Sequence, residues 1–408
     1  MKRAVMYGAG NIGRGFIGQL FSKSGYEVHF LDVNEEVVNL LNRDGRYPVN
    51  VVCGSSNEEQ FVENVRGVLT KDNAVAAKEI FEADVMASAV GVNVLKFIAK
   101  PIAMGIEMRM RAGKAPINII ICENLIDANL YLKKLILDNL PEELHKDFDK
   151  SVGLVEASIG RMVPVMDEKM QAGNKLRVYV EPYNVLPVDK DAFVGEIPKI
   201  ENMVPFSPFQ LFIQRKLFMH NMSHALCAYL GYLSGDKYVY EAASKPEIKL
   251  LALHALTESA RALSKENKVE IDSLLEHAEN LLYRFTNEAL KDTVARVGRD
   301  TQRKLSPNDR LAGAYRLCAK HGVPSTYICV GIAAALLFRP EGDASSVEIA
   351  DYAKLVSPRD ALKKYAGFTG TEPEMPFIER IYRELSSGAS AKELIPVCYE
   401  EGNKGVKI

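Results

Sequence analysis

The first fifteen residues restrict the fold of this chain more than any other segment. Arg3 to Tyr7 has the composition of a short buried strand, and Gly8-Ala-Gly-Asn-Ile-Gly13 follows at once, before a helical pattern. The glycines match G-x-G-x-x-G in the strand–turn–helix setting of a dinucleotide-binding loop. In such a loop, Gly8 permits the turn, Gly10 lets a pyrophosphate approach the backbone, and Gly13 lets the helix lie close to its strand.

A carboxylate follows the second predicted strand. That strand, Glu27 to Leu31, ends in Asp32, which comes 19 residues after Gly13. A carboxylate at this place accepts hydrogen bonds from the ribose hydroxyls of the cofactor and repels a 2′-phosphate, so NAD is predicted rather than NADP. The alternative is a glycine turn in another kind of α/β protein, with Asp32 capping a helix.

Composition indicates a globular protein of two domains. The chain has 408 residues, 47% of them hydrophobic and 25% charged, and its net charge of −2 argues against nucleic acid or an anionic membrane as partner. The longest apolar run, Tyr327 to Phe338, is too short to cross a bilayer. The six cysteines and seven histidines lack metal-ligand spacings, so no metal site is expected. The scattered cysteines, together with a strand that begins near the N-terminus without a signal peptide, predict a cytoplasmic protein.

The hydrophobic pattern changes along the chain. Strands are predicted at 3–7, 27–31, 84–89, 117–122 and 152–156, with helical stretches between them, and a further strand near 176–183. Prolines at 187, 198, 205 and 208 then indicate a linker. Helical periodicity follows at 207–234, 246–265, 271–286, 309–320, 324–338 and 346–365. We therefore predict an α/β Rossmann-like N-terminal domain, residues 1–195, followed by an all-α C-terminal domain, residues 196–408. The active site is expected in the cleft between the two domains.

One helical segment of the second domain is rich in groups that can carry chemistry. At about 100° per residue, Lys216, His220, Asn221 and His224 fall on one broad helix face. A solvated face usually carries Glu and Lys instead. The segment is therefore either a catalytic helix or a polar helix between domains, with histidines whose hydrogen bonds are satisfied.

Lys216, Asn221 and His224 form K-x4-N-x2-H, which resembles the active-site signature of the polyol-specific long-chain dehydrogenases, the mannitol dehydrogenase family. Gly8 to Gly15 has that family's form of the nucleotide loop, and Cys122-Glu-Asn-Leu125 is similar to the segment that carries its active-site Asn. The basic segment 296–310 resembles that of the mannitol-1-phosphate 5-dehydrogenase branch.

The resemblance implies roles for these residues. Lys216 would act as general acid and base, Asn124 and Asn221 would donate amide hydrogens to the reacting oxygen, and His224 would hold a neighbouring hydroxyl or orient Lys216. The expected cofactor contacts are Gly8, Ala9, Gly10, Asn11, Ile12, Gly13, Asp32, Val90 and Asn124.

The basic segment is the best sequence clue to the substrate. In the family, the first Arg and the Lys eight positions later contact sugar hydroxyls, which corresponds to Arg296 and Lys304. Arg299 and Arg303 would then be spare cations, suited to a terminal phosphate. The alternative is an ordinary charged surface loop.

Two positions depart from the family pattern. In Ile159-Gly160-Arg161-Met162, Gly160 replaces the Asp that usually precedes this Arg, which weakens the expectation of standard mannitol 1-phosphate chemistry. His220 stands where close relatives place an apolar residue, so it would either compete with His224 for a role or only line the cleft.

The leading hypothesis is an NAD-dependent enzyme that interconverts D-mannitol 1-phosphate and D-fructose 6-phosphate, active as a monomer or small homo-oligomer. Alternatives are a reductase of a hexuronate or an unphosphorylated polyol, a β-hydroxyacid dehydrogenase, and a catalytically inactive NAD-sensing regulator. A short-chain reductase is excluded more firmly, because no Tyr is followed four residues later by Lys.

Overall fold

The computed structural model describes residues 1–164 and 166–402 and consists of two compact units. Unit 1 is Met1–Phe212 and unit 2 begins at Ile213. Each unit is described by itself below.

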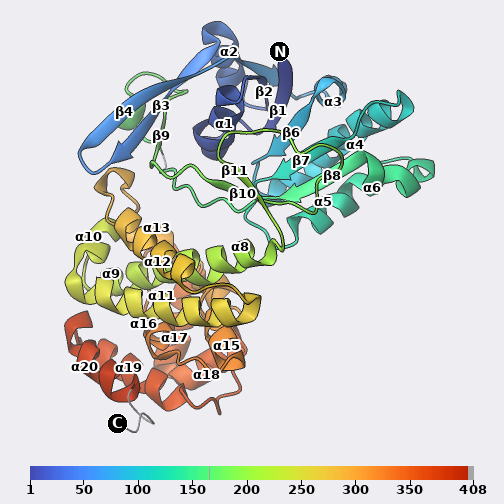
Figure 1. The fold of residues 1–408 in the computed structure, drawn as a ribbon. Helices are drawn as coiled ribbons and strands as arrows, with labels where there is room; N and C mark the ends of the chain where they lie inside the picture. Colours follow the sequence, from blue (N-terminus) through green and yellow to red (C-terminus); the bar gives the residue numbers. More distant parts are fainter. Residues whose placement is uncertain (165, 403–408) are drawn as a thin grey trace. The chain divides into compact units, whose positions relative to one another are not determined.

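The centre of unit 1 is a parallel six-stranded sheet with the strand order β5-β2-β1-β6-β7-β8 (Figure 1). The strands are β1 (Lys2–Tyr7), β2 (Tyr26–Asp32), β5 (Val65–Leu69), β6 (Val85–Ser88), β7 (Ile117–Ile121) and β8 (Val152–Glu156). The order reverses between β1 and β6, which is the switch point where a Rossmann-like sheet binds its ligand. This is the fold class that the sequence predicted for the N-terminal part.

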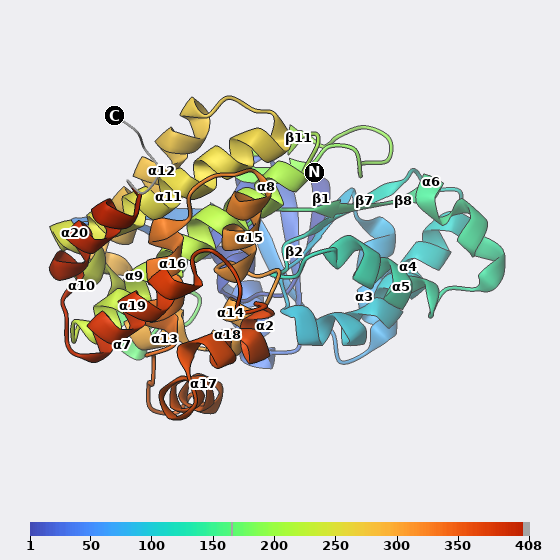
Figure 2. The ribbon, with the colours of Figure 1, turned by 90° about the horizontal axis from the view of Figure 1, so that it is seen from below.

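Alternate residues of the strands contribute to two cores on opposite faces of the sheet. Ala4 and Met6 pack with Phe16 and Leu20, from the segment that follows β1. The helices on this side are the π-helix η1 (Gly13–Ile17) and α1 (Gly18–Lys23). Val5 and Tyr7 pack into the other core, with α3 (Asn73–Glu82), α4 (Leu95–Arg111) and α5 (Ala128–Leu137). These three helices lie next to one another (Figure 2).

Several strands of unit 1 were not predicted. Strands β3 (Arg46–Cys53), β4 (Ser56–Glu63) and β9 (Val178–Val180) form a second sheet, of which only β9 was expected. Strand β4 is mostly polar and exposed, so its sequence lacks the alternation that marks a strand.

The prolines after the strand near 176–183 led us to predict a linker. That prediction was wrong, because two segments of this region are strands. Strands β10 (Leu186–Asp189) and β11 (Met203–Phe206) pair in parallel, although each contains a proline. A proline lacks only the N–H donor, and the Pro187 carbonyl still accepts a hydrogen bond from the Ser158 N–H at 3.0 Å. Ile200, just before β11, is buried in the core of unit 1. Unit 1 therefore extends to Phe212, rather than to the boundary at 195 suggested by the sequence.

The remaining elements of unit 1 are short. They are α2 (Glu35–Asp44), η2 (Val92–Val94), η3 (Glu142–Asp147), α6 (Phe148–Ser151) and α7 (Glu168–Gln171).

Unit 2 is helical, and residues 213–402 contain no strand. Its elements run from α8 (Gln210–Arg215), which crosses the boundary, through the π-helix η4 (Lys216–Asn221), α9 (Met222–Leu233), α10 (Val239–Ser244), α11 (Pro246–Asn267), α12 (Asp272–Phe285), η5 (Glu288–Leu290), α13 (Val294–Gly298) and α14 (Thr301–Leu305). They continue with α15 (Ala312–Lys320), α16 (Thr326–Ala335), α17 (Ala344–Leu355), α18 (Pro358–Ala366), α19 (Met375–Ser386) and α20 (Ala391–Gly402).

Helix α9 lies at the centre of unit 2, where it packs against α10, α11, α13 and α16. Its composition, apolar apart from Ser223 and His224 near its start, explains this position, because a helix that is apolar on most sides must be covered by others. The predicted block 346–365 is divided into α17 and α18. Ser357 caps α18 by accepting a hydrogen bond from the Asp360 N–H, and Pro358 occupies the first turn. Within the described residues, no helix combines the length and apolarity that a membrane span requires.

Candidate active site

The glycine loop of unit 1 has the geometry of a phosphate-binding turn. Gly8 has φ +100°, and a Cβ there would lie 2.6 Å from the Ala89 carbonyl oxygen. A Cβ on Gly13 would collide with the Gly8 carbonyl oxygen. Gly10 has no atom within 4 Å of its Cβ position, and it lines a cavity of about 500 Å³. The loop therefore leaves open space where the backbone would meet a pyrophosphate.

Asp32 stands at the rim of this cavity and also holds the loop. Its Oδ2 accepts a hydrogen bond from the Ala9 N–H at 2.7 Å, and its Oδ1 accepts one from the Asn34 N–H at 2.9 Å. Each carboxylate oxygen keeps a second lone pair for a ribose hydroxyl. The residues present thus fit the adenosine half of a dinucleotide.

The cavity separates the predicted cofactor residues into two groups. Gly8, Gly10, Asp32 and Val90 line it, together with Tyr7, Leu31, Val33, Thr70, Lys71, Asn73, Ala89, Val94, Phe97 and Ile98. Ala9, Asn11, Ile12, Gly13 and Asn124 are not among its lining residues. Asn124 is exposed on the segment that follows β7.

The Arg14 side chain supports the glycine loop through a hydrogen bond to the Ala9 carbonyl oxygen. The sequence did not lead us to predict this role. The side chain of Arg14 is buried, and the guanidinium donates to the carbonyl oxygens of Ala9 and Leu176. The Tyr47 hydroxyl donates to the Arg14 carbonyl oxygen at 2.7 Å. Burial lowers the pKa of Arg14. The sequence did carry a signal for this role, because Arg14 is a basic residue immediately after Gly13, the last glycine of the motif.

In unit 2, Lys216 and Asn221 are the first and last residues of the π-helix η4. An α-helix would separate them by about 140°, because each residue turns by about 100°. A π-helix bonds residues five apart along its axis, so residues with this spacing lie on the same side. The wider turn therefore brings Lys216 and Asn221 closer to one face than the sequence analysis assumed.

His220 and His224 pack with Phe285 in an aromatic cluster. The His224 ring stacks on Phe285 with centroids 4.7 Å apart, and the His220 ring lies 5.7 Å from Phe285 and 6.0 Å from His224. Burial, reinforced by the charge of Arg284, holds the pKa of His220 well below its ordinary value. Burial also lowers the pKa of His224 to about 4, although Asp292 opposes this shift. Both rings are therefore neutral at neutral pH.

Asp292 connects His224 to the basic segment. Its carboxylate forms an ion pair with Arg296, one helical turn later, and its Oδ2 lies 4.0 Å from Nε2 of His224. Sequence analysis did not single out Asp292. Asp292, just before α13, thus links Arg296 of α13 to His224 of α9.

Lys304 and Arg310 are the buried cations of the basic segment. The Lys304 ammonium donates to the Arg299 carbonyl oxygen, and Arg310 forms an ion pair with Asp309 at 2.8 Å. Burial, followed by the charges of Arg310 and Arg303, lowers the pKa of Lys304 to about 7. Lys304 and Arg310 also lower the pKa of His224, so the segment faces the histidine cluster.

The two arginines predicted as spare cations differ. Both side chains are exposed, but the Arg303 guanidinium pairs with Asp300 at 2.7 Å, so Arg303 is not a spare cation. The loop itself is anchored from α17, because Asp343 accepts a hydrogen bond from the Asp300 N–H at 2.8 Å. Asp300 adopts φ +61°, a conformation that Asp tolerates better than most residues.

The segment around Gly160 packs inside unit 1. Arg161 is buried, and its guanidinium donates to the carbonyl oxygen of Gly15 at 3.1 Å and to Oε1 of Gln19 at 2.6 Å. A Cβ on Gly160 would lie 3.1 Å from the Tyr183 ring and 3.5 Å from its hydroxyl. The Tyr183 side chain therefore lies where the missing carboxylate would begin.

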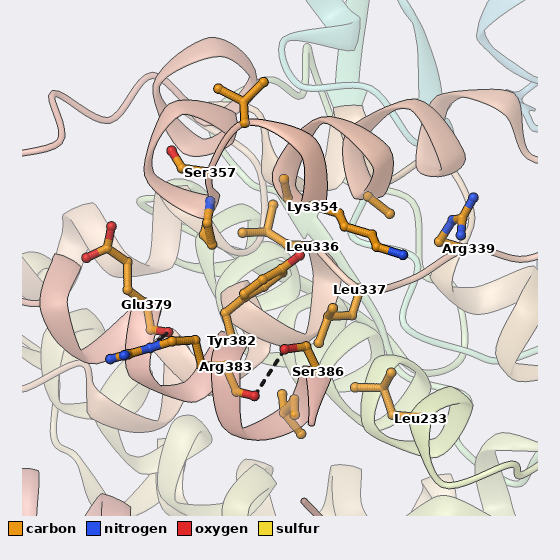
Figure 3. A pocket seen from close by; sticks show the side chains of 15 residues that line it. Leu233, Leu336, Leu337, Arg339, Lys354, Ser357, Glu379, Tyr382, Arg383 and Ser386 are labelled. Atoms are coloured by element: carbon orange, nitrogen blue, oxygen red, sulfur yellow. Dashed lines mark hydrogen bonds between the residues drawn. The ribbon is translucent and has the colours of Figure 1, made fainter. Parts of the chain in front are cut away.

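A second cavity, of about 910 Å³, lies in unit 2 between the ends of α9, α16, α17 and α19 (Figure 3). Leu336, Tyr382 and Arg383 are among its lining residues, and none of the predicted site residues lines it. The described part of the chain contains no group of three or more His, Cys, Asp or Glu side chains that could hold a metal ion.

Comparison with known protein families gives two matches that together cover most of the chain. The mannitol dehydrogenase Rossmann domain matches residues 2–202, and the mannitol dehydrogenase C-terminal domain matches residues 209–387.

Curated relatives share between 35% and 40% of their residues with this chain. The mannitol-1-phosphate 5-dehydrogenase of Clostridium acetobutylicum is 40% identical over 84% of this chain and 88% of its own length. The enzymes of that name from Shouchella clausii and Thermoanaerobacter pseudethanolicus are 38% and 35% identical, each over 94% of this chain and over 100% and 98% of their own lengths.

Two solved structures share the fold. A D-sorbitol dehydrogenase has a TM-score of 0.80 at 16% identity, over 96% of this chain and 95% of its own. The mannitol 2-dehydrogenase of Pseudomonas fluorescens, solved with NAD and D-mannitol, has a TM-score of 0.72 at 15% identity, over 97% and 94% of the two chains.

Proposed function

Since this chain belongs to the mannitol dehydrogenase family, we propose that it is an NAD-dependent dehydrogenase that interconverts D-mannitol 1-phosphate and D-fructose 6-phosphate. The observation that carries the proposal is the likeness, at 35–40% identity and over 84–94% of the chain, to enzymes named mannitol-1-phosphate 5-dehydrogenase. The resemblance found in the sequence pointed to the same family.

The choice of NAD over NADP follows from unit 1. Asp32 lines the cavity beside Gly8 and Gly10, where its carboxylate would accept hydrogen bonds from ribose hydroxyls and repel a 2′-phosphate. When bound, NAD would supply the hydride acceptor that oxidation of the substrate's secondary alcohol requires.

The remaining chemistry belongs to side chains of this protein. We assign to Lys216 the removal of the hydroxyl proton during oxidation and its return during reduction. Asn221, which shares the π-helix with Lys216, and Asn124 of unit 1 donate amide hydrogens to the same oxygen, whose negative charge grows as the proton leaves. The neutral His224 accepts a hydrogen bond from a neighbouring hydroxyl, a role supported by its lowered pKa of about 4.

The basic segment supports a phosphorylated substrate. Arg296, Arg299, Arg303 and Lys304 all belong to it, and guanidinium groups bind phosphate with two parallel hydrogen bonds. Because Arg303 is already paired with Asp300, we assign the first phosphate contact to Arg299 and a shared contact to Arg303. Arg296 and Lys304 are assigned to sugar hydroxyls.

The enzyme is proposed to work in the cytoplasm as a monomer or small homo-oligomer on a small-molecule substrate. All six cysteines are free thiols, in keeping with a reducing compartment. Light scattering coupled to size-exclusion chromatography would measure the oligomeric state.

Oxidation of NADH in the presence of several carbonyl substrates tests the function. Fructose 6-phosphate should be the best substrate, ahead of free fructose and ketohexuronates. If a ketohexuronate or free fructose is reduced more efficiently, the alternative reductase of the same family becomes the better assignment. Gly160 is the residue that favours this alternative.

Arg299 provides the test of phosphate binding. Arg299→Ala should raise KM for fructose 6-phosphate by about tenfold or more, because a hydrogen bond to a charged group contributes about 1.5–3 kcal/mol. The kcat value and the weak activity on free fructose should change little. Equal losses on both substrates would mean that Arg299 supports the fold or the sugar.

A further inference from the structure

Three carboxylates at the carboxyl edge of the parallel sheet share one arrangement. Each comes at the end of one strand and accepts a backbone N–H from the loop that follows the neighbouring strand. Asp32, at the end of β2, holds Ala9 after β1. Glu123, two residues after β7, holds the loop after β6, and Glu156, the last residue of β8, holds the loop after β7.

Glu123 uses both of its carboxylate oxygens. Oε1 accepts a hydrogen bond from the Val90 N–H and Oε2 accepts one from the Gly91 N–H, each at 2.9 Å. The side chain is buried, with 7% of its surface exposed. Val90 lines the cofactor cavity, and a Cβ on Gly8 would lie 3.1 Å from the Val90 side chain. Glu123 therefore fixes the wall of the cavity that faces the glycine loop.

Glu156 holds the far end of the segment that begins with Glu123. Its Oε1 accepts a hydrogen bond from the N–H of Ala128, the first residue of α5, at 2.9 Å. Burial, reinforced by the charges of Asp127 and Asp189, raises the pKa of Glu156 above its ordinary value. Asp127, just before Ala128, adopts φ +55°, so the chain turns sharply at this anchor.

Asn124 lies between these two anchors. The segment from 124 to 127 has no regular secondary structure, and its only residue with an assigned chemical role is Asn124. Strands β6, β7 and β8, which provide the two carboxylates and the loops that they hold, are neighbours in the sheet (Figure 1). The conformation of the Asn124 segment is thus determined by hydrogen bonds at both of its ends.

We infer that Glu123 and Glu156 are positioning residues for Asn124, and that Glu123 also positions the Val90–Gly91 wall of the cofactor cavity. The inference rests on the proposed function, because that function makes Asn124 a donor to the reacting oxygen. An amide that must meet an oxygen within hydrogen-bond distance loses effect when its backbone moves by about 1 Å. The two glutamates therefore differ in what they control: Glu156 controls catalysis alone, and Glu123 controls both catalysis and cofactor binding.

Variants of similar side-chain size separate these two roles. Glu123→Gln keeps the shape of the side chain, but it replaces one of two accepting oxygens with an amide NH2 that cannot accept a hydrogen bond. Glu156 holds Ala128 through one oxygen, which a glutamine would retain, so Glu156→Met is the variant that removes this bond. For Glu156→Met, kcat should fall on the order of tenfold, with the Kd of NADH unchanged. For Glu123→Gln, kcat should fall to a similar degree and the Kd of NADH should rise on the order of tenfold.

Glu258→Gln is the matched control. Glu258 is also a buried glutamate that accepts backbone N–H bonds, from Tyr327 at 3.1 Å and Ile328 at 3.0 Å, but it belongs to the helical unit. Its substitution should leave kcat and the Kd of NADH within about twofold of the unmodified enzyme. Thermal unfolding of all three variants shows whether they differ in stability.

A double-mutant cycle with Asn124→Ala distinguishes positioning from general destabilisation. If Glu156 acts through Asn124, then Glu156→Met should lower kcat when Asn124 is present but have almost no further effect when Asn124 is already Ala. The inference would be overturned if the losses in kcat caused by the Glu156 and Asn124 substitutions were additive. It would also be overturned if Glu258→Gln lowered kcat as much as the Glu156 substitution does. An Asn124→Ala variant with full activity would overturn it as well.

Failure of the proposed function would be recognised separately. If the unmodified enzyme does not reduce fructose 6-phosphate, the cycle is measured with whichever carbonyl compound it reduces best. The Kd of NADH, measured by fluorescence titration, requires no substrate at all. An unchanged Kd in Glu123→Gln would then overturn the role of Glu123 in the cofactor cavity, whatever the substrate.

Discussion

At the scale of single residues, burial and ion pairing give the basic side chains of one short segment different properties. Lys304 and Arg310 are buried, whereas Arg296, Arg299 and Arg303 are exposed. Arg310 has a carboxylate partner in Asp309, while Lys304 donates to a carbonyl oxygen. Lys304 is the member of this group whose pKa falls to about 7, so its charge depends on pH in the neutral range.

The pH dependence of substrate binding should show the loss of the proton from Lys304. Below its pKa of about 7 the side chain is an ammonium group that can donate to the substrate with a full charge, and above this pKa it is neutral. The value of kcat/KM for fructose 6-phosphate should therefore contain a component that falls as pH rises through about 7. Arginine stays protonated, so this component should be absent from Lys304→Arg, measured over the same pH series. A component that persists with the same apparent pKa would belong to another group.

Lys216 should prove essential for proton transfer. Lys216→Ala should lower kcat for polyol oxidation by about 10²–10⁴-fold, which is the usual contribution of a general acid or base. The Kd of NADH should change little, because the residues that line the cofactor cavity all belong to unit 1. Stopped-flow turnover and fluorescence titration measure these two quantities. If the variant keeps more than about a tenth of the activity, Lys216 is not the base, and His220 or His224 becomes the next candidate.

At the scale of secondary-structure elements, both π-helices of the structure coincide with proposed functional segments. The first, Gly13–Ile17, follows the glycine loop, and the second, Lys216–Asn221, contains the proposed base. A π-turn interrupts the regular α-helical hydrogen bonds and is usually retained where function requires it. For η4, the benefit that follows from the proposed roles is that Lys216 and Asn221 would serve one substrate oxygen.

Removal of one residue from η4 tests this view. Deletion of Leu217 should convert the wide turn to α-helical spacing, since Lys216 and Asn221 would then be four residues apart. The pair would keep a common face, because four α-helical residues and five residues of the wider π-turn end at nearly the same angle. If the wide turn serves only to align Lys216 with Asn221, kcat should stay within about tenfold of the unmodified enzyme, far above that of Lys216→Ala. A loss as large as that of Lys216→Ala, in a variant that keeps its helical circular dichroism, would show that the π-turn does more than align this pair.

At the scale of the whole molecule, each unit has its own buried core. The sheet of unit 1 is covered on both faces, and the last contributions to its core come from Ile200 and Met203, close to β11. In unit 2, α9 is surrounded by other helices. Because the two cores are separate, we expect unit 1 to fold without unit 2.

Two fragments test the boundary between the units. A fragment of residues 1–212 should unfold cooperatively and bind NADH with a Kd within a few fold of that of the full chain, without turnover. A fragment of residues 1–195 lacks β11 and Ile200, so β10 loses its partner and the core loses a buried side chain. Its Tm should be clearly lower than that of the longer fragment. Equal Tm values would place the end of the folded unit near 195.

The sequence by itself determined those features that depend on short stretches of chain. The glycine loop, Asp32 at the end of its strand, the change from strands to helices and the K-x4-N-x2-H spacing are all local. Each of these features predicts the same local structure wherever the rest of the chain lies, because backbone conformation and strand or helix periodicity depend on residues that are near in the sequence. These features were enough to identify the family.

Only the tertiary structure decided which charges are paired, which are buried and how loops are held. The Val90–Glu123 bond joins residues 33 positions apart, and the Asp300–Asp343 bond joins residues 43 apart. The Arg161–Gln19 bond spans 142 positions. Such partners, and the burial that lowers the pKa of Lys304, arise from chain segments that meet only on folding. A sequence pattern records which residues are near in the chain, whereas the energy of a buried charge depends on which residues are near in space.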